Sequence, residues 1–293
     1  MASLTIVWEE LPHKEAFAQI FDRFRQCGRA IVAYSGGVDS TLLLKIGTLA
    51  IGEACLGVIA RSETLSDEES EAALALARDH DFNLYTIRYS ELEIENYAAN
   101  PLNRCYFCKH ELFSRLTRIA GELGIQTIID GSNADDVGDW RPGMQAAAEL
   151  NVVSPLRDSG LTKEAIRDLA RALCLGNWDK PSAPCLASRI AYGLAIDKTK
   201  LTQVAEGERF LRQHGFRVVR VRHHDTIARI EVSPSDLPRL VEPAMRERVV
   251  AHLRELGFRH VTVDLLGYRS GSLNEGLVKP PGETPANEES PKE

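Results

Sequence analysis

The stretch RAIVAYSGGVDSTLLLKIG, residues 29–47, decides how this chain folds. Residues 29–34 form a short run of apolar and β-branched side chains, which predicts a buried strand. A glycine-containing turn follows at residues 35–40, and apolar side chains then continue through residues 41–52 as they do in a helix. A strand, a glycine turn and a helix in this order predict the first βα unit of a parallel sheet.

The same alternation continues on both sides of this stretch. A helix is predicted before it, at residues 13–28. Further strands are predicted at residues 53–60, 83–88 and 126–130, and further helices at residues 67–80, 107–123 and 161–174. This alternation indicates the α/β class, with a parallel sheet covered by helices on both faces. Ligands of such sheets bind beyond the carboxyl ends of the strands, which is where residues 35–40 lie.

The pattern changes near residue 195. An amphipathic helix is followed by two alternating strands, a helix and a last strand, at residues 197–215, 216–222, 227–232, 243–256 and 259–265. We therefore predict an α/β domain at 1–194, a small α+β domain at 195–274 and a disordered tail at 275–293, which is rich in Pro and Glu. The HHDT run between the two strands is interpreted as a hairpin turn, with His223 and His224 as turn residues.

Composition excludes several classes of protein. The 293 residues include 44% apolar residues, and the net charge is −7. A negative chain does not suit nucleic acid as its main partner, although a local basic pocket can hold a small anionic nucleotide. No apolar run reaches the roughly 18–20 residues that span a bilayer, and the first residues lack the pattern of a signal peptide. We therefore expect a cytoplasmic protein without a membrane segment.

The turn Ser35-Gly36-Gly37-Val38-Asp39-Ser40 has the chemistry of a phosphate-binding loop. Glycines let the backbone approach phosphate closely, and the amides at a helix start favour an anion. The hydroxyls of Ser35 and Ser40 add donors, whereas Asp39 has the wrong charge for phosphate and suits Mg²⁺ or a helix cap. The pattern is not the Walker loop, which needs GKS or GKT. The plainer alternative is a Ser-Gly turn that only caps a helix.

A second loop, residues 130–136, also follows a predicted strand and is a candidate for the nucleotide side of the site. An ordinary turn is the alternative. Lys109 is a candidate for neutralising phosphate charge, and a solvated lysine near a helix start is its alternative interpretation.

Six cysteines in a chain of this length do not indicate a disulfide scaffold. The pair Cys105 and Cys108 is ambiguous by itself, because a CxxC motif serves zinc, redox chemistry or an iron–sulfur cluster. Cys185 lies in the proline-containing run KPSAPCLASR, beside Ser188 and Arg189. Neighbouring cations lower a thiol pKa, so Cys185 is the candidate nucleophile. The remaining cysteines are interpreted as small buried hydrophobic residues: Cys27, Cys55 and Cys174.

Two arginines alternate with valines along the predicted strand 216–222. Arg220 and Arg222 would share one face, and two guanidinium groups on one face suit a phosphate. The alternative is a solvated strand face in which an arginine pairs with Glu231 across the hairpin.

Several motifs together resemble the LarE-type sulfur transferases of the PP-loop, or N-type, ATP pyrophosphatase superfamily. The similarity spans roughly residues 15–275 and is carried, in order, by SGGVDS (35–40), RCYFCK (104–109), DWRPG (139–143), PCLASRIAYG (184–193), RVRHHDTIARIE (220–231) and VDLLGYRSGSLN (263–274). The resemblance implies an adenine nucleotide alpha hydrolase-like fold and cleavage of ATP to AMP and pyrophosphate. It also implies a substrate, pyridinium-3,5-biscarboxylic acid mononucleotide, whose carboxylates become thiocarboxylates of a nickel-pincer cofactor.

The resemblance also implies roles for particular residues. It assigns the phosphate of the mononucleotide to Arg220 and Arg222, with Ser188 and Arg189 nearby. It relates Glu208 and Glu231 to acidic positions associated with metal or substrate. Beyond these assignments, ATP and Mg²⁺ are the expected cofactors and a homo-oligomer is the expected assembly.

Two branches of the family differ in their sulfur source. In one branch, the residue that matches Cys185 gives up its own sulfur, and the positions of Cys105 and Cys108 are not cysteine. In the other branch, three cysteines hold a [4Fe-4S] cluster with one iron free for hydrosulfide. Because this chain has all three cysteines, we expect Cys105, Cys108 and Cys185 to hold such a cluster.

Three other functions remain open at this point. A PP-loop tRNA thiolase would need a basic RNA-binding surface, for which the sequence gives no signal. An amide-forming ligase of the NAD or GMP synthetase type would leave the three cysteines without a role. A nucleotide-binding redox sensor would bind ATP without turning it over.

Overall fold

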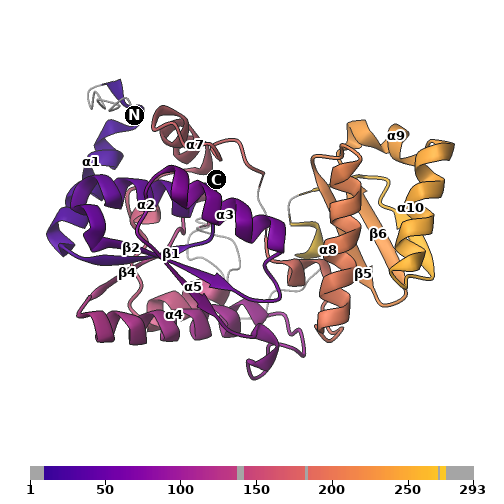
Figure 1. Ribbon diagram of the computed structural model, residues 1–293, viewed down its shortest axis with the longest axis horizontal. Coiled ribbons are helices and arrows are strands. Elements are labelled where there is room, and N and C mark those ends of the chain that lie inside the picture. Colours follow the sequence, from indigo (N-terminus) through magenta and orange to yellow (C-terminus); the bar gives the residue numbers. More distant parts are fainter. Residues whose placement is uncertain (1–9, 137–141, 182–183, 270, 275–293) are drawn as a thin grey trace, which may run out of the picture.

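The computed structural model describes residues 10–136, 142–181, 184–269 and 271–274 (Figure 1). The predicted tail at 275–293 and most of the DWRPG motif therefore lie outside the described residues. In the part that is described, no helix is long and apolar enough to cross a membrane.

The first part of the chain contains the predicted parallel sheet. Its four strands run in the order β3-β2-β1-β4, and all three pairings are parallel. Their bounds are β1 Ala30–Tyr34, β2 Cys55–Arg61, β3 Leu84–Arg88 and β4 Thr127–Ile129. Strand β1 is central, since Ala30 lies opposite both Cys55 of β2 and Thr127 of β4. The predicted α/β fold class is confirmed.

Helices cover both faces of this sheet, as Figure 1 shows. One face is covered by α1 Lys14–Cys27, α2 Val38–Ile51, α3 Asp67–Asp79 and α7 Lys163–Ala172. The other face is covered by α4 Arg104–Leu123 and α5 Pro142–Glu149, and the four-residue helix α6 Pro155–Asp158 precedes α7. Each face has its own apolar core, because strands that are covered on both sides point apolar side chains in both directions.

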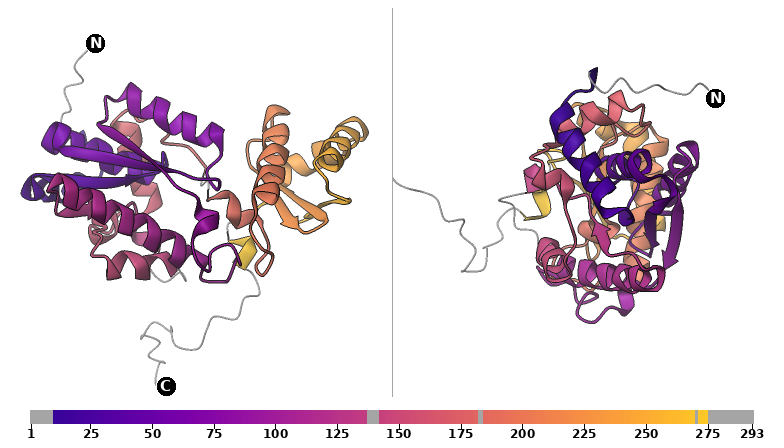
Figure 2. Two further views of the ribbon diagram at one scale, coloured as in Figure 1. Left: turned by 60° about the horizontal axis from the view of Figure 1, so that its bottom comes forward. Right: turned by 90° about the vertical axis from the view of Figure 1, so that its left-hand side faces the viewer.

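The second part of the chain forms a small α+β unit beside the first (Figure 2). It contains α8 Lys198–Gln213, β5 Val219–His224, β6 Ile227–Val232, α9 Leu237–Val241, α10 Pro243–Glu255 and β7 His260–Val263. Strand β6 pairs antiparallel with β5 and parallel with β7. A separate apolar core lies between this sheet and its helices. The division of the chain at residues 194 and 195 stays a prediction.

The hairpin corrects the interpretation of His223 and His224. Both residues belong to β5, and only Asp225 and Thr226 connect the strands, with Asp225 at φ 57°. A two-residue turn needs a positive φ, which Asp tolerates better than most residues, so the strand continues further than the predicted turn allowed. The buried ring of His223 instead lies 2.9 Å from Gln203 Oε1 of α8.

Gly47 sets how closely α2 can approach its neighbours. A Cβ atom at this position would lie 2.4 Å from Cys55 Sγ and 2.7 Å from the Phe24 ring. Gly121 is also inside a helix, in α4, but a Cβ atom there would meet no atom within 4 Å.

Alanine substitutions at these two glycines should change the stability of the protein in opposite directions. Gly47→Ala should destabilise the protein by about 1–3 kcal/mol through overpacking, which outweighs the higher helix propensity of alanine. Gly121→Ala should stabilise the protein by up to about 1 kcal/mol, because only the propensity changes. Denaturant unfolding of both variants measures the difference, and equal effects of the two substitutions would contradict the close approach at Gly47.

Candidate active site

The loop at residues 35–40 joins the carboxyl end of β1 to the start of α2. Gly36 has φ +70°, and a Cβ atom there would lie 2.4 Å from the Cβ of Ala73 in α3. Inside the loop, the Ser35 amide donates to Ser40 Oγ at 3.1 Å, and that hydroxyl donates to the Gly37 carbonyl at 3.2 Å. Gly37 is the N-cap of α2 and makes no side-chain cap bond. The helix therefore begins with backbone amides at a place where an anion is favoured.

Asp39 links this loop to the second loop at residues 130–136. Its carboxylate is paired with Lys163 and accepts a bond of 3.3 Å from the side-chain amide of Asn133. Asp39 therefore does not cap the helix, because the N-cap of α2 is Gly37. The structure thus brings both predicted nucleotide-side loops together at the carboxyl edge of the sheet.

Two residues to which the sequence analysis gave no role at the loop 35–40 also hold it in place. Asn177 donates to the Gly36 carbonyl at 3.1 Å, and Lys180 donates to the same carbonyl at 3.4 Å. Lys180 precedes Cys185 by five residues, so their Cα atoms are at most about 18 Å apart. The candidate nucleophile therefore lies on a segment that is attached to the phosphate loop through Lys180.

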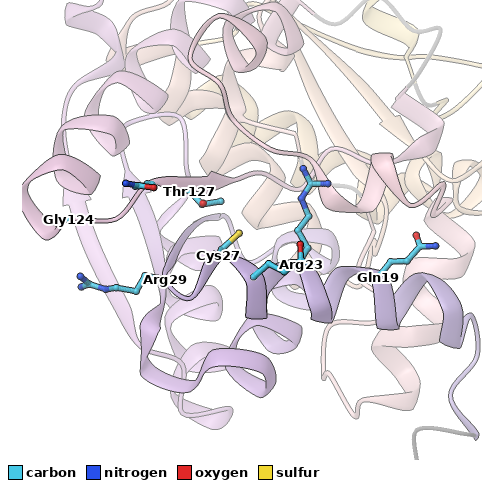
Figure 3. A pocket seen from close by; sticks show the side chains of 8 residues that line it. Gln19, Arg23, Cys27, Arg29, Gly124 and Thr127 are labelled. Carbon is cyan, nitrogen blue, oxygen red and sulfur yellow. The ribbon is translucent and has the colours of Figure 1, made fainter.

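Two cavities are lined by described residues. One, of about 450 Å³, lies where β2 and β3 end and is lined by Arg61, Ser62, Glu63, Leu65, Asp67, Ser70, Arg88 and Tyr89. The other, of about 650 Å³, lies at the opposite edge of the sheet, beside Arg29 before β1 and Thr127 at the start of β4 (Figure 3). None of the predicted site residues lines this second cavity. The cavity at the ends of β2 and β3 shares its edge of the sheet with the phosphate loop.

Electrostatic interactions link the three predicted cluster cysteines. Cys105 and Cys108 are in the first turns of α4, and Cys185 precedes the short 3-10 turn Leu186–Arg189. In addition to burial, Cys105 raises the pKa of Cys185, and Cys185 raises the pKa of Cys108. Within the described residues, no three His, Cys, Asp or Glu side chains are arranged to hold a single metal ion. A mononuclear zinc site therefore gains no support, whereas cluster thiolates bind separate irons and need not converge on one point.

Asn100 and Arg104 fix the two cysteine-bearing segments to each other. The side-chain amide of Asn100 donates to the carbonyls of Ala191 and Leu194, at 2.8 and 2.9 Å. Arg104, at the start of α4, donates to Asn100 Oδ1 at 2.7 Å and lies over the Tyr192 ring. Because both polar side chains are buried, these bonds hold the segment after Cys185 against the start of α4.

Glu91 is a buried carboxylate that contacts Cys108 and that no sequence motif signals. We use the name cysteine pocket for Cys105, Cys108, Cys185 and Glu91 together. It accepts a bond from Thr64, one of 3.2 Å from the Tyr97 hydroxyl and one of 3.2 Å from the Cys108 thiol. The Thr64 carbonyl in turn accepts a bond of 2.8 Å from the amide of Leu186. Glu91 therefore connects the CxxC helix, the end of β2 and the Cys185 segment.

The environment of Cys185 corrects the expected activation of its thiol. Although the residue is accessible to solvent, the surrounding protein desolvates its sulfur and raises the pKa to about 11, with Cys105 and Glu91 adding to the rise. Arg104 and Arg189 lower the pKa, but they do not reverse the shift. The prediction that neighbouring cations activate this thiol was therefore wrong in its net direction.

Arg189 lies in a buried ion pair. Its guanidinium donates to both carboxylate oxygens of Glu208 in α8, at 2.8 and 3.1 Å. The remaining guanidinium nitrogen, Nη1, donates to the carbonyls of Pro184 and Cys185 and to the Ser188 hydroxyl. The contacts of Arg189 thus hold the Cys185 turn in place. Arg189 was expected beside a substrate phosphate, whereas in the structure its guanidinium is occupied by these protein groups.

Arg222 is buried in a similar pair with Glu231. It donates to both carboxylate oxygens, at 3.0 and 2.8 Å, and also to the Ser188 carbonyl at 2.9 Å. Arg220 is also buried, donates to its neighbour's carbonyl and lies over the Tyr268 ring. The alternative of a solvated strand face is therefore excluded, because both arginines are buried. Its second part, an arginine paired with Glu231, is confirmed for Arg222.

The structure also places Lys109 and the three cysteines that were interpreted as buried hydrophobic residues. The Lys109 ammonium lies 5.3 Å from the centre of the Phe113 ring, and its stem packs where a Cβ atom of Gly143 would be. Cys55 is buried as expected, and burial raises the pKa of its thiol to about 12. Cys174 is exposed at the end of α7 with φ +56°, so its interpretation as a buried hydrophobic residue was wrong. Cys27 is only partly buried.

A parallel sheet with this loop at the end of its central strand defines an ATP pyrophosphatase of the PP-loop class. No model of a known protein family matches the chain. It is 37% identical over 252 residues to the pyridinium-3,5-bisthiocarboxylic acid mononucleotide synthase of Lactiplantibacillus plantarum, covering 86% of this chain and 91% of that protein. The chain therefore belongs to the LarE-like family of ATP pyrophosphatases, and this family implies the use of ATP.

Two further relatives place this assignment in context. An uncharacterized protein of Synechocystis is 42% identical over 256 residues, which are 87% of this chain and 96% of that protein. One of the chains of the glutamine-hydrolyzing GMP synthase of Pyrococcus furiosus is 25% identical over 195 residues, covering 60% of this chain and 61% of that protein. The wider similarity therefore joins the chain to nucleotide-dependent ligases through only part of its length.

The Arg189–Glu208 pair gives a stability prediction. Burial raises the pKa of Glu208, but Arg189, Arg220 and the backbone amide of Val221 together outweigh burial and leave the pKa below its ordinary 4.5. Glu208→Gln should cost about 3–5 kcal/mol at neutral pH, because it leaves a buried guanidinium without its counter-charge. A group with a lowered folded-state pKa stabilises above its unfolded pKa, so the difference from the parent should shrink as pH falls below about 4.5.

Glu206→Gln is the matched control, because Glu206 lies on the same helix in a more exposed pair with Arg209. It should cost less than about 1 kcal/mol. Denaturant unfolding at several pH values measures both variants. Equal costs at neutral pH, or a Glu208→Gln difference that grows in acid, would contradict a charged buried pair.

Proposed function

We propose that this chain uses ATP to adenylate a carboxylate of pyridinium-3,5-biscarboxylic acid mononucleotide and converts that carboxylate to a thiocarboxylate. The observation that carries the proposal is the joint position of the cysteines and the phosphate loop. Cys185 interacts with Cys105 and Cys108, and its segment also holds the Gly36 carbonyl through Lys180. The relative from Lactiplantibacillus plantarum, named as the synthase of the bisthiocarboxylic product, supports this choice of substrate.

The adenylation step is assigned to the carboxyl edge of the sheet. ATP would place its phosphates at the amides of loop 35–40 and its nucleoside in the cavity where β2 and β3 end. A substrate carboxylate oxygen then attacks the α phosphorus, the bond to the bridging oxygen breaks, and pyrophosphate leaves. Backbone amides fixed by the helix start stabilise the charge that develops on the phosphates.

The sulfur-transfer step is assigned to the cysteine pocket. A sulfur nucleophile attacks the carbonyl carbon of the acyl-adenylate, and the bond to AMP breaks so that AMP leaves. The buried Arg189–Glu208 pair holds the Cys185 turn, and Asn100 with Arg104 holds this segment against the CxxC helix. These contacts fix the Cys185 segment relative to the helix that carries Cys105 and Cys108.

We favour the cluster as the sulfur carrier over loss of sulfur from Cys185. Cys105, Cys108 and Cys185 would hold it, and a bound [4Fe-4S] cluster with three protein thiolates supplies one iron that is open to hydrosulfide. The raised pKa of Cys185 agrees with this choice, since a free thiol in this pocket stays protonated at neutral pH. Metal ligation deprotonates a thiol without help from a base.

The mononucleotide phosphate is assigned to the arginines beside Ser188. Burial lowers the pKa of Arg220, and the charges of Arg189 and Arg222 lower it further, so the three guanidinium groups share one region. Two buried carboxylates, Glu208 and Glu231, balance part of this charge. The remaining positive charge favours a dianionic phosphate beside Ser188, where the small α+β unit meets the Cys185 turn.

One experiment separates the two steps. With ATP, the biscarboxylic mononucleotide and sulfide, Cys185→Ser should still release about one pyrophosphate per chain but form no thiocarboxylate, because only the sulfur step is lost. Cys174→Ser is the control, since Cys174 is an exposed cysteine outside the pocket, and it should behave as the parent. Pyrophosphate release and product mass measure the two steps.

The same assay distinguishes the rival functions. Thiocarboxylate formed by Cys185→Ser at the parental rate would exclude Cys185 from sulfur transfer. Pyrophosphate release that depends on ammonia or on tRNA, and not on the mononucleotide, would instead show an amide-forming ligase or a tRNA thiolase. Iron and sulfide analysis after anaerobic purification tests the cluster, and loss of the mass of H₂S from Cys185 after one turnover would show the sacrificial route.

A further inference from the structure

Arg104 carries a positive charge that the described residues leave without a partner of opposite charge. It is the first residue of α4, directly before Cys105, and only 2% of it is exposed. In the part of the chain that the structure describes, its side chain contacts neutral groups, the Asn100 side-chain oxygen at 2.7 Å and the Tyr192 ring. The Nε atom of Arg104 is buried and has no hydrogen-bond partner among the described residues.

A buried guanidinium without a counter-charge is costly, because the free energy lost with its hydration must be offset by an opposite charge or by hydrogen bonds. The carboxylate of the cysteine pocket does not supply that charge. Glu91 accepts bonds from Thr64, Tyr97 and Cys108 and forms no ion pair with Arg104. Arg104 therefore has both a charge and an unused donor for an anionic ligand.

This charge lies beside the Cys185 segment. Asn100, which holds Arg104, also donates to carbonyls of the chain just after Cys185. Burial raises the pKa of the Cys185 thiol and Arg104 opposes that rise, so the guanidinium and the sulfur interact. Cys185 is exposed, and Tyr192, whose ring covers the guanidinium, is only half-buried. A ligand that reaches Cys185 therefore meets Arg104 when the Tyr192 ring moves aside.

The chemistry of the proposed substrate supplies an anion for this place. Its pyridinium ring carries two carboxylates, at ring positions 3 and 5. When the carbonyl carbon of one is placed for attack by sulfur at the cysteine pocket, the other is held across the same ring and stays anionic while the first is joined to AMP. A guanidinium is planar and carries paired donors, so it binds a carboxylate through two parallel hydrogen bonds.

We propose that Arg104 is a specificity-determining residue, which binds the second carboxylate of the substrate while the first one reacts. No covalent bond to Arg104 forms or breaks. The two ends of the substrate then have separate arginines, because Arg220 and Arg222 are assigned to its phosphate. This role rests on the proposed function, since it takes the biscarboxylic mononucleotide as the substrate.

The test compares two mononucleotides by calorimetry without ATP, so that neither is turned over. The probes are the biscarboxylic mononucleotide and nicotinamide mononucleotide, which has the same ring, ribose and phosphate but a neutral amide and no carboxylate. Arg104→Met should weaken binding of the biscarboxylic probe about tenfold or more, because a charge-assisted pair is lost. It should leave binding of nicotinamide mononucleotide within about twofold of the parent, because a neutral amide forms no such pair.

Arg118→Met is the matched control. Arg118 lies on the same helix as Arg104 but is exposed. Its replacement removes the same charge from α4, so it corrects for a general change in electrostatic potential. The Arg118→Met variant should bind both mononucleotides as the parent does. A thermal melt of each variant reports whether the variant has folded.

Arg104→Lys is a second variant, needed because Arg104→Met leaves the buried Asn100 oxygen without its donor. Lysine keeps the charge but lacks the paired donors. The preference for the biscarboxylic probe over nicotinamide mononucleotide should therefore fall about threefold or more in Arg104→Lys, and further in Arg104→Met. An unchanged preference in Arg104→Lys would overturn the proposed role. An equal loss of both probes in Arg104→Met would do the same, because it would show only a disordered start of α4.

Failure of this role is distinguishable from failure of the proposed function. If the parent prefers the biscarboxylic probe and Arg104→Met keeps that preference, only the role of Arg104 is wrong. If the parent binds both mononucleotides equally, or binds neither, the biscarboxylic mononucleotide is not the substrate, and the role of Arg104 is overturned with it.

Discussion

The buried ion pair between Arg189 and Glu208 ties together the parts of the molecule on which the candidate chemistry depends. Arg189 belongs to the turn that carries Cys185, and Glu208 belongs to α8 of the second part. Because both groups are buried, neither can be left without the other except at a large cost in free energy. The position of the cysteine turn is therefore fixed relative to the small α+β unit, and Glu208 also accepts the backbone amide of Val221 in β5.

A second set of polar contacts fixes the same turn relative to the parallel sheet. Glu91 joins the CxxC helix to the end of β2 through Thr64, and the Thr64 carbonyl holds the amide of Leu186. Asn177 and Lys180 attach the preceding segment to the Gly36 carbonyl of the phosphate loop. The Cys185 turn is thus held from three sides by buried or partly buried hydrogen bonds. Such an arrangement would preorganise the two reaction centres of the proposed function, which must act on one bound substrate.

The sequence predicted most of the elements because their signals are local. The apolar period of α2, the short β-rich runs of the sheet and the glycine turn at residues 35–40 depend only on neighbouring residues. The end of β5 was placed too early because a two-residue turn at Asp225 can replace a longer one without a change in the apolar pattern. The candidate cysteines and loop residues were also found from local motifs, although their roles stay predictions.

By itself, the sequence determined the α/β class and the position of the loop 35–40 at the end of the first strand, and it marked three cysteines as candidates for the chemistry. Only the tertiary structure decided the partners of the charged residues. It paired Arg189 with Glu208, placed Glu91 against Cys108 and set Lys163 against Asp39. The physical reason is that periodicity and turn chemistry act over a few residues, whereas ion pairs and pKa values depend on groups that folding brings together from distant positions.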